Sequence, residues 1–424
     1  MKLCITNGRV LDPATGFDAP ASVNIENGKI VHVGNALPAD ETIDARGSLV
    51  VPGLIDMHVH FREPGREDKE TIRGGAYTAA RSGYTSVVTM PNTTPPVDNQ
   101  ALIRYIRMEA EQSGYVNIFP AACVTKGMKG EEISEMGTLA EAGAVAFTDD
   151  GLPVSNALVM RRALEYSRMF DMPIMAHEED HTLNDGGIIN EGVVSNTLGI
   201  RGIPRESEEV MIARDILLSR LTGGRLHIQH LSSGGSAELV RWGKAQGIRV
   251  TAETAPHYFS LTDEVVREKL AMAKMSPPLR TENDRKKIIE ALRDGTIDCI
   301  ATDHAPHLIN EKRQEIEFAP NGIIGLETAV PLMITELVRN AGFTYTQAFA
   351  KVTCNPASIL KLPKGRIAEG ADADITIIDP ERPVTIDDTF FASKSRNSPF
   401  IGMKLFGHVA CTILGGRIVY TGEN

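Results

Sequence analysis

Six side chains that can bind a metal ion come directly after short apolar runs of the sequence. They are His58, His60, Asp150, His177, His230 and Asp303. His58 and His60 are two residues apart, so in a strand their imidazoles lie on the same face. One histidine at a strand end is more often a hydrogen-bonded structural residue, but six such groups at similar positions favour a shared site. Imidazole and carboxylate together suit Zn²⁺, and six donors suit two ions better than one.

Two divalent ions side by side need an anion between them. Asp150, in the segment "FTDDG", is the candidate for this bridge. Asp149 points to the other side if the strand is regular, because side chains alternate. We therefore expect Asp149 to be structural.

The segment "MAHEEDH" contains an H-E-x-x-H pattern from His177 to His181. In metalloproteases this pattern binds zinc because both histidines share one face of a helix. Here the preceding residues 171–176 form a short apolar run that contains Pro173, which predicts a strand. The sequence therefore does not favour a metalloprotease, and we expect His177 to act with other partners.

Eight β-rich runs alternate with helical stretches, which is typical of parallel βα units. The runs end near residues 60, 92, 125, 150, 177, 230, 257 and 307. Helices are predicted between them, for example over 156–170 and 207–221, from apolar residues at i, i+3 and i+4. We predict a (β/α)8 TIM barrel, whose active sites lie at the carboxyl ends of the strands. A doubly wound open sheet is the alternative, but its Gly-rich first turn is missing.

The two ends of the chain have a different pattern of short strands and turns. We expect residues 1–52 and 364–424 to form one small β-sandwich domain, and residues 53–363 to form the barrel.

Composition excludes some classes of protein. The net charge of −11 over 424 residues argues against a nucleic-acid partner. No apolar run reaches the roughly 18 residues of a membrane span. Five scattered cysteines fit reduced thiols. We expect a soluble cytoplasmic protein with a small-molecule substrate.

Several motifs resemble those of one family. The segments "GLIDMHVHFREPG", "MPNTTP", "FTDDG", "ATDHAPH" and "GADADITIIDP" are similar to a bacterial dihydroorotase of the amidohydrolase superfamily. The resemblance covers nearly the whole chain, and it is closest to the longer-chain type with Asp in place of a carboxylated lysine. In agreement, no lysine occurs from Gly130 to Trp242.

The resemblance implies an activity and a set of roles. The reaction would be the reversible interconversion of N-carbamoyl-L-aspartate and L-dihydroorotate in pyrimidine biosynthesis, by metal-activated hydroxide attack on the ring amide. His58 and His60 would hold the more buried zinc, and His177 and His230 the more exposed one. Asp150 would bridge the two ions, and Asp303 would complete the buried site and act as the catalytic base.

A substrate carboxylate needs a cation other than the metal. Arg62 lies two residues after His60, on the same face, and its planar fork suits a carboxylate. Asn92 can add a donor, and His307 resembles a second carboxylate contact of the family. The remaining predicted substrate contacts are His60, Ser276, Asn321 and Gly322, while His257 and His304 are expected to be structural. Ser276 and Asn321 replace residues usual in the family (Asn and Phe), and both positions would touch the substrate ring.

Alternatives remain open at this point. Another cyclic amidase (hydantoinase, dihydropyrimidinase or allantoinase) would share the barrel and the H-x-H pattern but would not need Arg62. A non-catalytic homologue could bind aspartate transcarbamoylase, a possible partner of the active enzyme too. A homo-oligomer, most simply a dimer, is expected. The Gly-rich residues 185–204 are either a mobile cover or a long surface loop.

Overall fold

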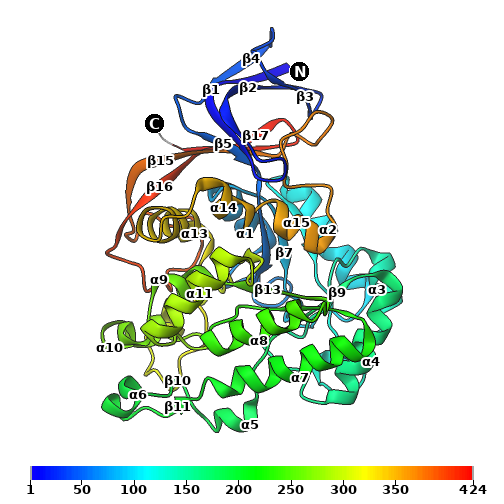
Figure 1. The fold of residues 1–424 in the computed structure, drawn as a ribbon, viewed down its shortest axis with the longest axis vertical. Coiled ribbons are helices and arrows are strands. Elements are labelled where there is room, and N and C mark those ends of the chain that lie inside the picture. The colour runs from blue at the N-terminus through cyan, green and yellow to red at the C-terminus, as the bar shows by residue number, and fades with distance from the viewer. Residues whose placement is uncertain (1, 423–424) are drawn as a thin grey trace.

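The computed structural model describes residues 2–422 and consists of a barrel of parallel strands beside a β-sandwich. In Figure 1 the sandwich lies above the barrel, and both ends of the chain lie in the sandwich. The predicted fold, a TIM barrel with a β-sandwich built from both terminal segments, is confirmed.

The barrel strands pair in parallel in two groups. The first group is β6 (Leu54–Val59), β7 (Tyr84–Thr89) and β8 (Asn117–Pro120), and the second is β9 (Pro173–Ala176), β12 (Arg225–Ile228), β13 (Val250–Thr254) and β14 (Cys299–Ile300). Phe147 forms bridges to Ala122 and Ile174 and so joins the groups on one side. A bridge between Val59 and His304 closes the other side.

The predicted fourth strand is present only as these single bridges. The amide of Phe147 donates to Pro173 O (3.2 Å), and the amide of Met175 donates to Phe147 O (2.8 Å). On the other side, the amide of Ala122 donates to Ala146 O (3.0 Å), and the amide of Thr148 donates to Ala122 O (2.8 Å). The segment thus occupies a strand position without forming a regular strand.

Fifteen α-helices connect and cover the strands in the described residues. They are α1 (Ile72–Arg81), α2 (Gln100–Ser113), α3 (Met136–Ala142), α4 (Ala157–Ser167), α5 (His181–Asn184), α6 (Val193–Leu198), α7 (Glu206–Thr222), α8 (Gly234–Ala245), α9 (Pro256–Ser260), α10 (Val266–Lys269), α11 (Glu282–Asp294), α12 (Ile309–Lys312), α13 (Leu326–Leu332), α14 (Tyr345–Ala350) and α15 (Cys354–Leu360). The two helices named from the sequence are α4 and α7. Asn156 caps α4 by accepting from the amides of Leu158 and Val159, and Gly223, whose φ is +69°, caps α7 at its carboxyl end.

The sandwich joins the two ends of the chain in one eight-stranded sheet. Its strands are β1 (Lys2–Asp12), β2 (Phe17–Glu26), β3 (Lys29–Gly34), β4 (Glu41–Asp44), β5 (Leu49–Pro52), β15 (Ile375–Thr385), β16 (Lys404–Leu414) and β17 (Arg417–Thr421). Strand β5 pairs with β1 on one side and with β15 on the other. Leu3, Ile5, Val23, Ile375 and Ile413 belong to its buried apolar core. The residue limits of the two domains stay a prediction.

The sandwich contacts the end of the barrel opposite to the predicted site. Gly53, just before β6, donates its amide hydrogen to Asp374 O (2.8 Å), and Thr376 Oγ1 donates to Gly83 O (2.6 Å), just before β7. The carboxyl ends of the strands therefore remain available for a site. Among residues 2–422 no helix has the length and apolar character that crossing a membrane requires.

Candidate active site

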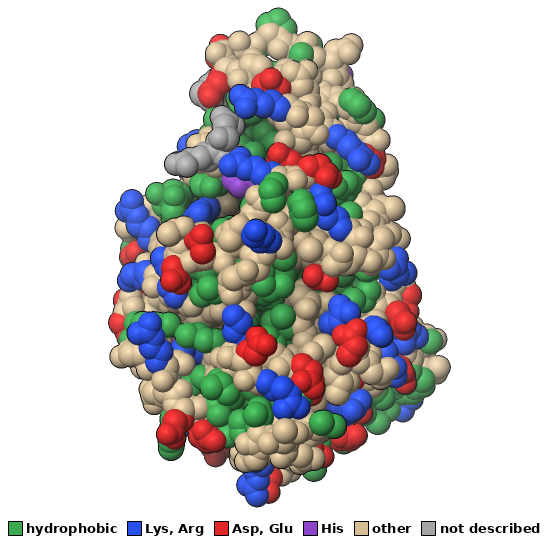
Figure 2. Space-filling model, turned by 90° about the vertical axis from the view of Figure 1, so that its left-hand side faces the viewer, with side chains coloured by type: hydrophobic (Ala, Val, Ile, Leu, Met, Phe, Trp, Pro, Cys, Tyr) green, Lys and Arg blue, Asp and Glu red, His purple; other side chains and the backbone are tan. Residues whose placement is uncertain are grey.

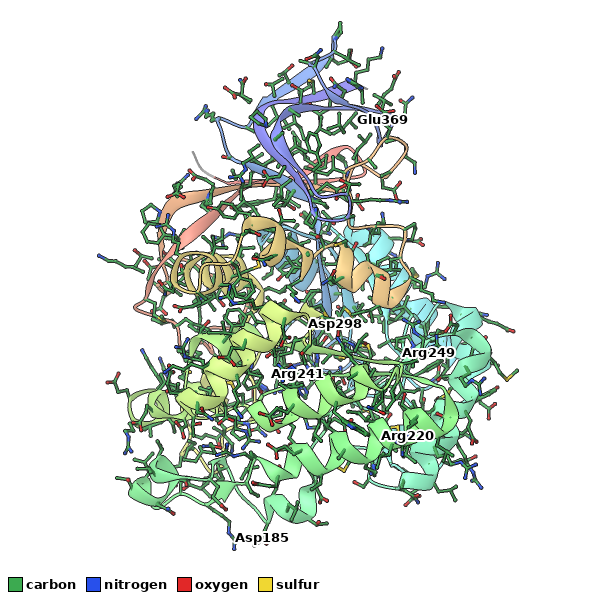
Figure 3. The ribbon with its side chains drawn as sticks, in the orientation of Figure 1. Asp185, Arg220, Arg241, Arg249, Asp298 and Glu369 are labelled. Atoms are coloured by element: carbon green, nitrogen blue, oxygen red, sulfur yellow. The ribbon has the colours of Figure 1, made fainter. Side chains whose placement is uncertain are left out.

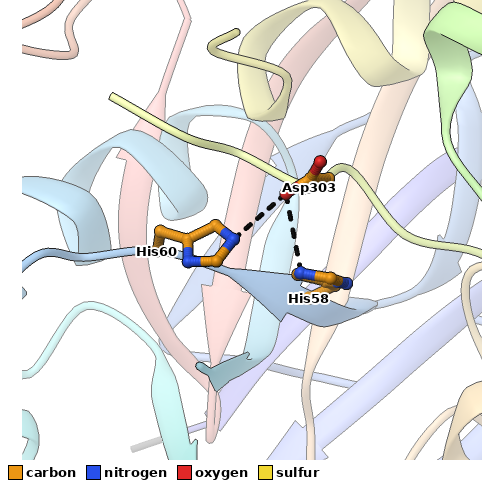
Figure 4. A group of neighbouring side chains, drawn as sticks. All are labelled: His58, His60 and Asp303. Atoms are coloured by element: carbon orange, nitrogen blue, oxygen red, sulfur yellow. Dashed lines mark hydrogen bonds and ion pairs between the residues drawn. The ribbon is translucent and has the colours of Figure 1, made fainter. Parts of the chain in front are cut away.

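The structure brings the six predicted metal ligands together at the carboxyl ends of the barrel strands. His58 lies in β6, and the other five, His60, Asp150, His177, His230 and Asp303, follow strands or the bridged segment 144–148. Figure 4 shows that one Asp303 oxygen lies between the imidazoles of His58 and His60, at 3.5 Å and 3.1 Å from their Nε2 atoms. The oxygens of Asp150 lie 3.2 Å from Nε2 of both His58 and His230.

The hydrogen bonds of His58 orient a lone pair into this cluster. Its Nδ1 lies 2.8 Å from an oxygen of Glu253, and a carboxylate only accepts, so Nδ1 carries the proton. In the neutral imidazole, the form that binds a metal ion, Nε2 then directs its lone pair toward the oxygens of Asp150 and Asp303. This nitrogen is fully buried and has no hydrogen-bond partner among residues 2–422. A lone pair facing two carboxylates is repulsive unless a positive charge lies between them.

His60 and His177 repeat the arrangement. His60 Nδ1 donates to the amide oxygen of Asn92 (2.9 Å), which turns its Nε2 lone pair toward Asp303. His177 Nε2 donates to Glu179 Oε2 (3.2 Å), and its Nδ1 lies 2.9 Å from His230 Nε2. Acceptors behind the rings thus direct nitrogen lone pairs toward the two aspartates, which is how metal-binding histidines are held in proteins.

The electrostatics of the cluster favour a cation. Burial lowers the pKa of the His58 imidazole, but the carboxylates of Asp150 and Asp303 outweigh it and raise the pKa well above its ordinary value. Although burial opposes it, His58, His177 and His230 lower the pKa of Asp150 well below its usual range. The donor set of four imidazoles and two carboxylates therefore fits divalent metal ions, and zinc suits it by ligand type.

The adjacent Asp149 is turned away from the cluster, as the alternation of side chains predicts. Its carboxylate accepts from the amides of Val124 (2.8 Å) and Thr125 (3.1 Å) and from the Thr125 hydroxyl. Burial raises the pKa of Asp149 to about 6. Its role is to hold the segment before the cluster in place.

A cavity of about 360 Å³ opens above the metal-ligand cluster. Every predicted substrate contact lines it, namely His60, Arg62, Asn92, Ser276, His307, Asn321 and Gly322. Five of the six predicted metal ligands line it too, whereas His58 lies behind them. The sequence thus identified residues from eight separate segments that share one cavity.

Arg62 is placed to receive an anion. Its Nε donates to Pro306 O (3.2 Å), and among residues 2–422 its guanidinium forms no ion pair with a carboxylate. Burial lowers its pKa to about 10. The backbone of Arg62 is left-handed (φ +62°), as are those of His230 (+33°) and Asp303 (+49°). Such strained conformations persist where the surrounding structure imposes them, and they often mark functional sites.

The two departures from the family pattern have structural consequences. The Ser276 hydroxyl donates to Glu179 Oε2 (2.5 Å), so it supports the carboxylate that orients His177. Asn321 is exposed, and its backbone oxygen, rather than its side chain, accepts from His307 Nε2 (2.8 Å). The change to Asn therefore leaves this backbone contact intact.

The Gly-rich residues 185–204 form a wall of the cavity. They contain α6 and the short strands β10 (Ile189–Asn190) and β11 (Gly202–Ile203), which pair in parallel. Gly187 and Ile203 line the cavity, and Arg280 donates to Asn190 Oδ1 (3.1 Å) and Ile203 O (2.9 Å). In Figure 3, Asp185 at the start of this segment lies at the end of the molecule farthest from Glu369 of the sandwich. The mobility of residues 185–204 stays a prediction.

The two histidines without a predicted role at the site, His257 and His304, are both buried. His304 Nδ1 accepts from the amide of Gly325 (3.2 Å) at the start of α13. His257 is buried in the first turn of α9. His177 directly follows β9, whereas His181 begins α5, so the H-E-x-x-H residues do not lie on one helix.

Sequence reasoning missed three buried charged residues at the site. They are Glu179, Glu253 and Lys69, which contact His177, His58 and His307 respectively. Glu179 carries a weak signal, because it lies two residues after His177. Glu253 and Lys69 are far from their partners in the sequence, and no local pattern identifies them.

Comparisons with known proteins show the family of the chain. The family model "Dihydro-orotase-like" matches residues 47–236, and the model "Amidohydrolase family" matches residues 269–420. The chain is 54% identical to a dihydroorotase of Pelotomaculum thermopropionicum, over 99% of this chain and 98% of that protein. The chain belongs to the dihydroorotase family. A dihydroorotase of Syntrophotalea carbinolica is 52% identical, over 99% of both chains.

Solved structures support the fold. An L-hydantoinase (dihydropyrimidinase) from Arthrobacter aurescens superimposes with a TM-score of 0.88 at 24% identity, over 99% of this chain and 96% of that one. A dihydropyrimidinase from Brevibacillus agri gives 0.86 at 23% identity, over 99% and 95%. At this identity the likeness concerns the fold alone.

Proposed function

We propose that this member of the dihydroorotase family interconverts N-carbamoyl-L-aspartate and L-dihydroorotate, a step of pyrimidine biosynthesis. In the opening direction water adds to the ring carbonyl carbon, the C–N bond breaks, and the nitrogen gains a proton. The observation that carries the proposal is a buried His–Asp cluster in the same cavity as Arg62, a half-buried guanidinium with no carboxylate partner among residues 2–422. The first group suits hydrolysis of an amide, and the second suits a substrate with a carboxylate.

We propose that the cluster holds two zinc ions. His58 and His60 with Asp303 would hold the more buried one, His177 and His230 the more exposed one, and Asp150 would lie between them. A divalent metal supplies Lewis acidity, which polarises an amide oxygen and lowers the pKa of a coordinated water to about 7. The lone pairs directed by Glu253, Asn92 and Glu179 support this assignment.

Asp303 is the proposed proton carrier. Despite burial, the imidazoles of His58 and His60 lower the pKa of its carboxyl, so it is ionised and can accept a proton from the attacking water. It lines the cavity and has one oxygen 3.1 Å from His60 Nε2. After accepting the proton it can deliver it to the leaving nitrogen, as a general base and then a general acid.

The proposed carboxylate site is at the other side of the cavity. Arg62 provides the charge and a planar fork. Because Asn92 accepts from His60 through its oxygen, its amide nitrogen is left to donate into the cavity. His307 adds a third donor, and Ser276, Asn321 and Gly322 shape the wall around the ring.

The test is a steady-state assay of zinc-loaded protein on L-dihydroorotate, hydantoin, dihydrouracil and allantoin. We expect turnover of L-dihydroorotate and at least about a hundredfold loss of kcat in Asp303→Asn, because general base catalysis contributes roughly that much or more. Metal content is measured for both proteins, since Asp303 is also a proposed ligand. A matched control is Asp298→Asn, which lies on the opposite end of the barrel and pairs with Lys244.

Turnover of only the uncharged rings would contradict the role of Arg62 and favour another cyclic amidase. A metal-loaded protein without activity on all four substrates would favour a non-catalytic partner of aspartate transcarbamoylase.

A homodimer is also proposed. Val210, Leu217 and Leu221 lie on one face of α7 and are 44%, 44% and 61% exposed. Their spacing of seven and four residues places them along one side of the helix, as in a helix that packs against a partner. Figure 2 shows a different face, on which acidic and basic side chains are interspersed.

A further inference from the structure

Lys69 is a buried lysine in the loop between β6 and α1, and it lies behind the proposed carboxylate site. It is 7% exposed. Its Nζ is 3.0 Å from His307 Nδ1 and 3.0 Å from Glu311 Oε2. His307 follows it by 238 residues, so only the fold brings the two together. Lys69 does not line the cavity itself, and the roles described so far do not use it.

The partners of His307 determine which ring nitrogen carries the proton. A lysine ammonium has donors only, so Nδ1 must accept from Lys69. A backbone carbonyl only accepts, so Nε2 must donate to Asn321 O, 2.8 Å away. Both contacts require the same neutral tautomer, with the proton on Nε2. The ion pair with Glu311 holds the ammonium in position for this contact.

This tautomer makes the end of the cavity a set of donors. Arg62 Nη2 lies 3.3 Å from His307 Nε2, and both atoms carry hydrogens in the arrangement above. Two donors this close are stabilised by an acceptor between them, and among residues 2–422 the only acceptor for the His307 Nε2 hydrogen is the neutral backbone oxygen of Asn321. An anionic oxygen is a stronger acceptor than a carbonyl, since charge-assisted hydrogen bonds are about twice as strong as neutral ones. A substrate carboxylate can therefore take or share the Nε2 hydrogen.

We infer that Lys69 is a positioning residue for substrate specificity: it fixes His307 in the Nε2–H tautomer, so that the ring donates to a carboxylate held by Arg62. Lys69 itself touches neither the substrate nor the proposed metal ligands. The inference rests on the proposed function for the identity of the anion, but the tautomer is a property of the free protein. Without Lys69 the other tautomer becomes accessible, and its Nε2 lone pair repels a carboxylate.

The first experiment measures the tautomer directly. Protein labelled with ¹⁵N-histidine gives two-bond ¹⁵N–¹H spectra that distinguish a protonated from an unprotonated ring nitrogen, and His307→Gln identifies the signals. We expect Nε2–H for His307 in the wild type, in zinc-loaded protein without substrate. An Nδ1–H tautomer would overturn the inference whether or not the protein turns over dihydroorotate. This readout therefore separates failure of the inference from failure of the proposed function.

The second experiment measures kinetics of Lys69→Met and Lys69→Arg. We expect Lys69→Met to raise KM for L-dihydroorotate about tenfold, the effect of losing one hydrogen bond to a charged group, with kcat within about twofold. The metal content should not change, because Lys69 contacts none of the proposed ligands. Lys69→Arg keeps a donor behind Nδ1 and should restore most of the affinity.

The control is Lys351→Met. Lys351 is similarly buried (6% exposed) and donates to Ile297 O (2.7 Å) at the amino-terminal end of the barrel. Its loss should cost stability without raising KM. An equal rise of KM in both methionine variants would mean that Lys69 is only structural. If Lys69→Met does not fold, the tautomer of the wild type and the KM of Lys69→Arg still decide the question.

Discussion

The two sides of the active-site cavity are opposite in charge and in hydrogen-bonding character. On the metal side, nitrogen lone pairs and carboxylate oxygens converge, for example His58 Nε2 and Asp150 Oδ2 at 3.2 Å. On the carboxylate side, N–H groups converge, with Arg62 and His307 at 3.3 Å. In the protein alone the groups on each side repel one another, because lone pairs face carboxylate oxygens on the metal side and N–H groups face each other on the carboxylate side. One side requires cations and the other requires an anion.

Histidine contributes to both sides of the cavity, but with opposite hydrogen-bonding roles. The metal side places an acceptor behind each ring, such as Glu253 behind His58, which turns a lone pair inward. The carboxylate side places a donor, Lys69, behind His307, which turns an N–H inward. A histidine therefore binds a cation or an anion according to the residue behind it. The following predictions test this contrast, from the largest effect to the smallest.

Removal of metal ions from the metal side of the cavity should abolish turnover. We expect a chelator to lower turnover of L-dihydroorotate by at least about 1000-fold, since metal ions contribute several kcal/mol to such barriers. Added Zn²⁺ should restore it. Turnover and bound metal are measured on the same samples. Full activity in metal-free protein would show that the lone pairs of the cluster serve only structure.

Removal of the guanidinium should disable the other side alone. We expect Arg62→Met to raise KM for L-dihydroorotate by about 10- to 100-fold, because two charge-assisted hydrogen bonds are lost. Metal content should stay that of the wild type, as measured by elemental analysis. Arg62→Lys should recover part of the affinity, since a point charge lacks the fork. A loss of metal in Arg62→Met would contradict the separation of the two sides.

The acceptor behind His177 should govern metal affinity. We expect Glu179→Ala to weaken binding at the more exposed position by about 10- to 100-fold, the usual effect of losing such a partner. Competition with a chromophoric chelator measures it. Glu179→Gln still offers an oxygen to His177 and should lose much less. An unchanged affinity in Glu179→Ala would mean that packing alone holds the ring.

The N-terminal cap of α14, far from the cavity, should affect stability but neither metal binding nor substrate binding. The Thr344 hydroxyl accepts from the amide of Gln347 (3.1 Å), and the Gln347 side chain accepts from the amide of Thr344 (2.9 Å), at the start of α14. We expect Thr344→Ala to lower the free energy of unfolding by about 1 kcal/mol. Denaturant unfolding and the dihydroorotate assay are run together, and a changed KM would argue against independence.

Much of this protein follows from the sequence because the relevant rules are local. Alternation places His58 and His60 on one face and separates Asp150 from Asp149, and both expectations agree with the structure. Strand-and-helix periodicity predicts the barrel, and polar residues after each apolar run predict which end carries the site. The fourth strand was predicted too, but its segment pairs only through single bridges from Phe147 to Ala122 and Ile174, a detail that no local pattern indicates.

The amino-acid sequence by itself determined the family, the barrel and the residue types that meet at its rim. Only the tertiary structure decided which groups form hydrogen bonds with the outer ring nitrogens of those histidines. Glu253 lies 195 residues from His58, and Lys69 lies 238 residues from His307. The proton on an imidazole depends on whether its neighbour donates or accepts, and that neighbour is chosen by packing across the barrel. The chemistry of each histidine is therefore a property of the fold, not of its place in the chain.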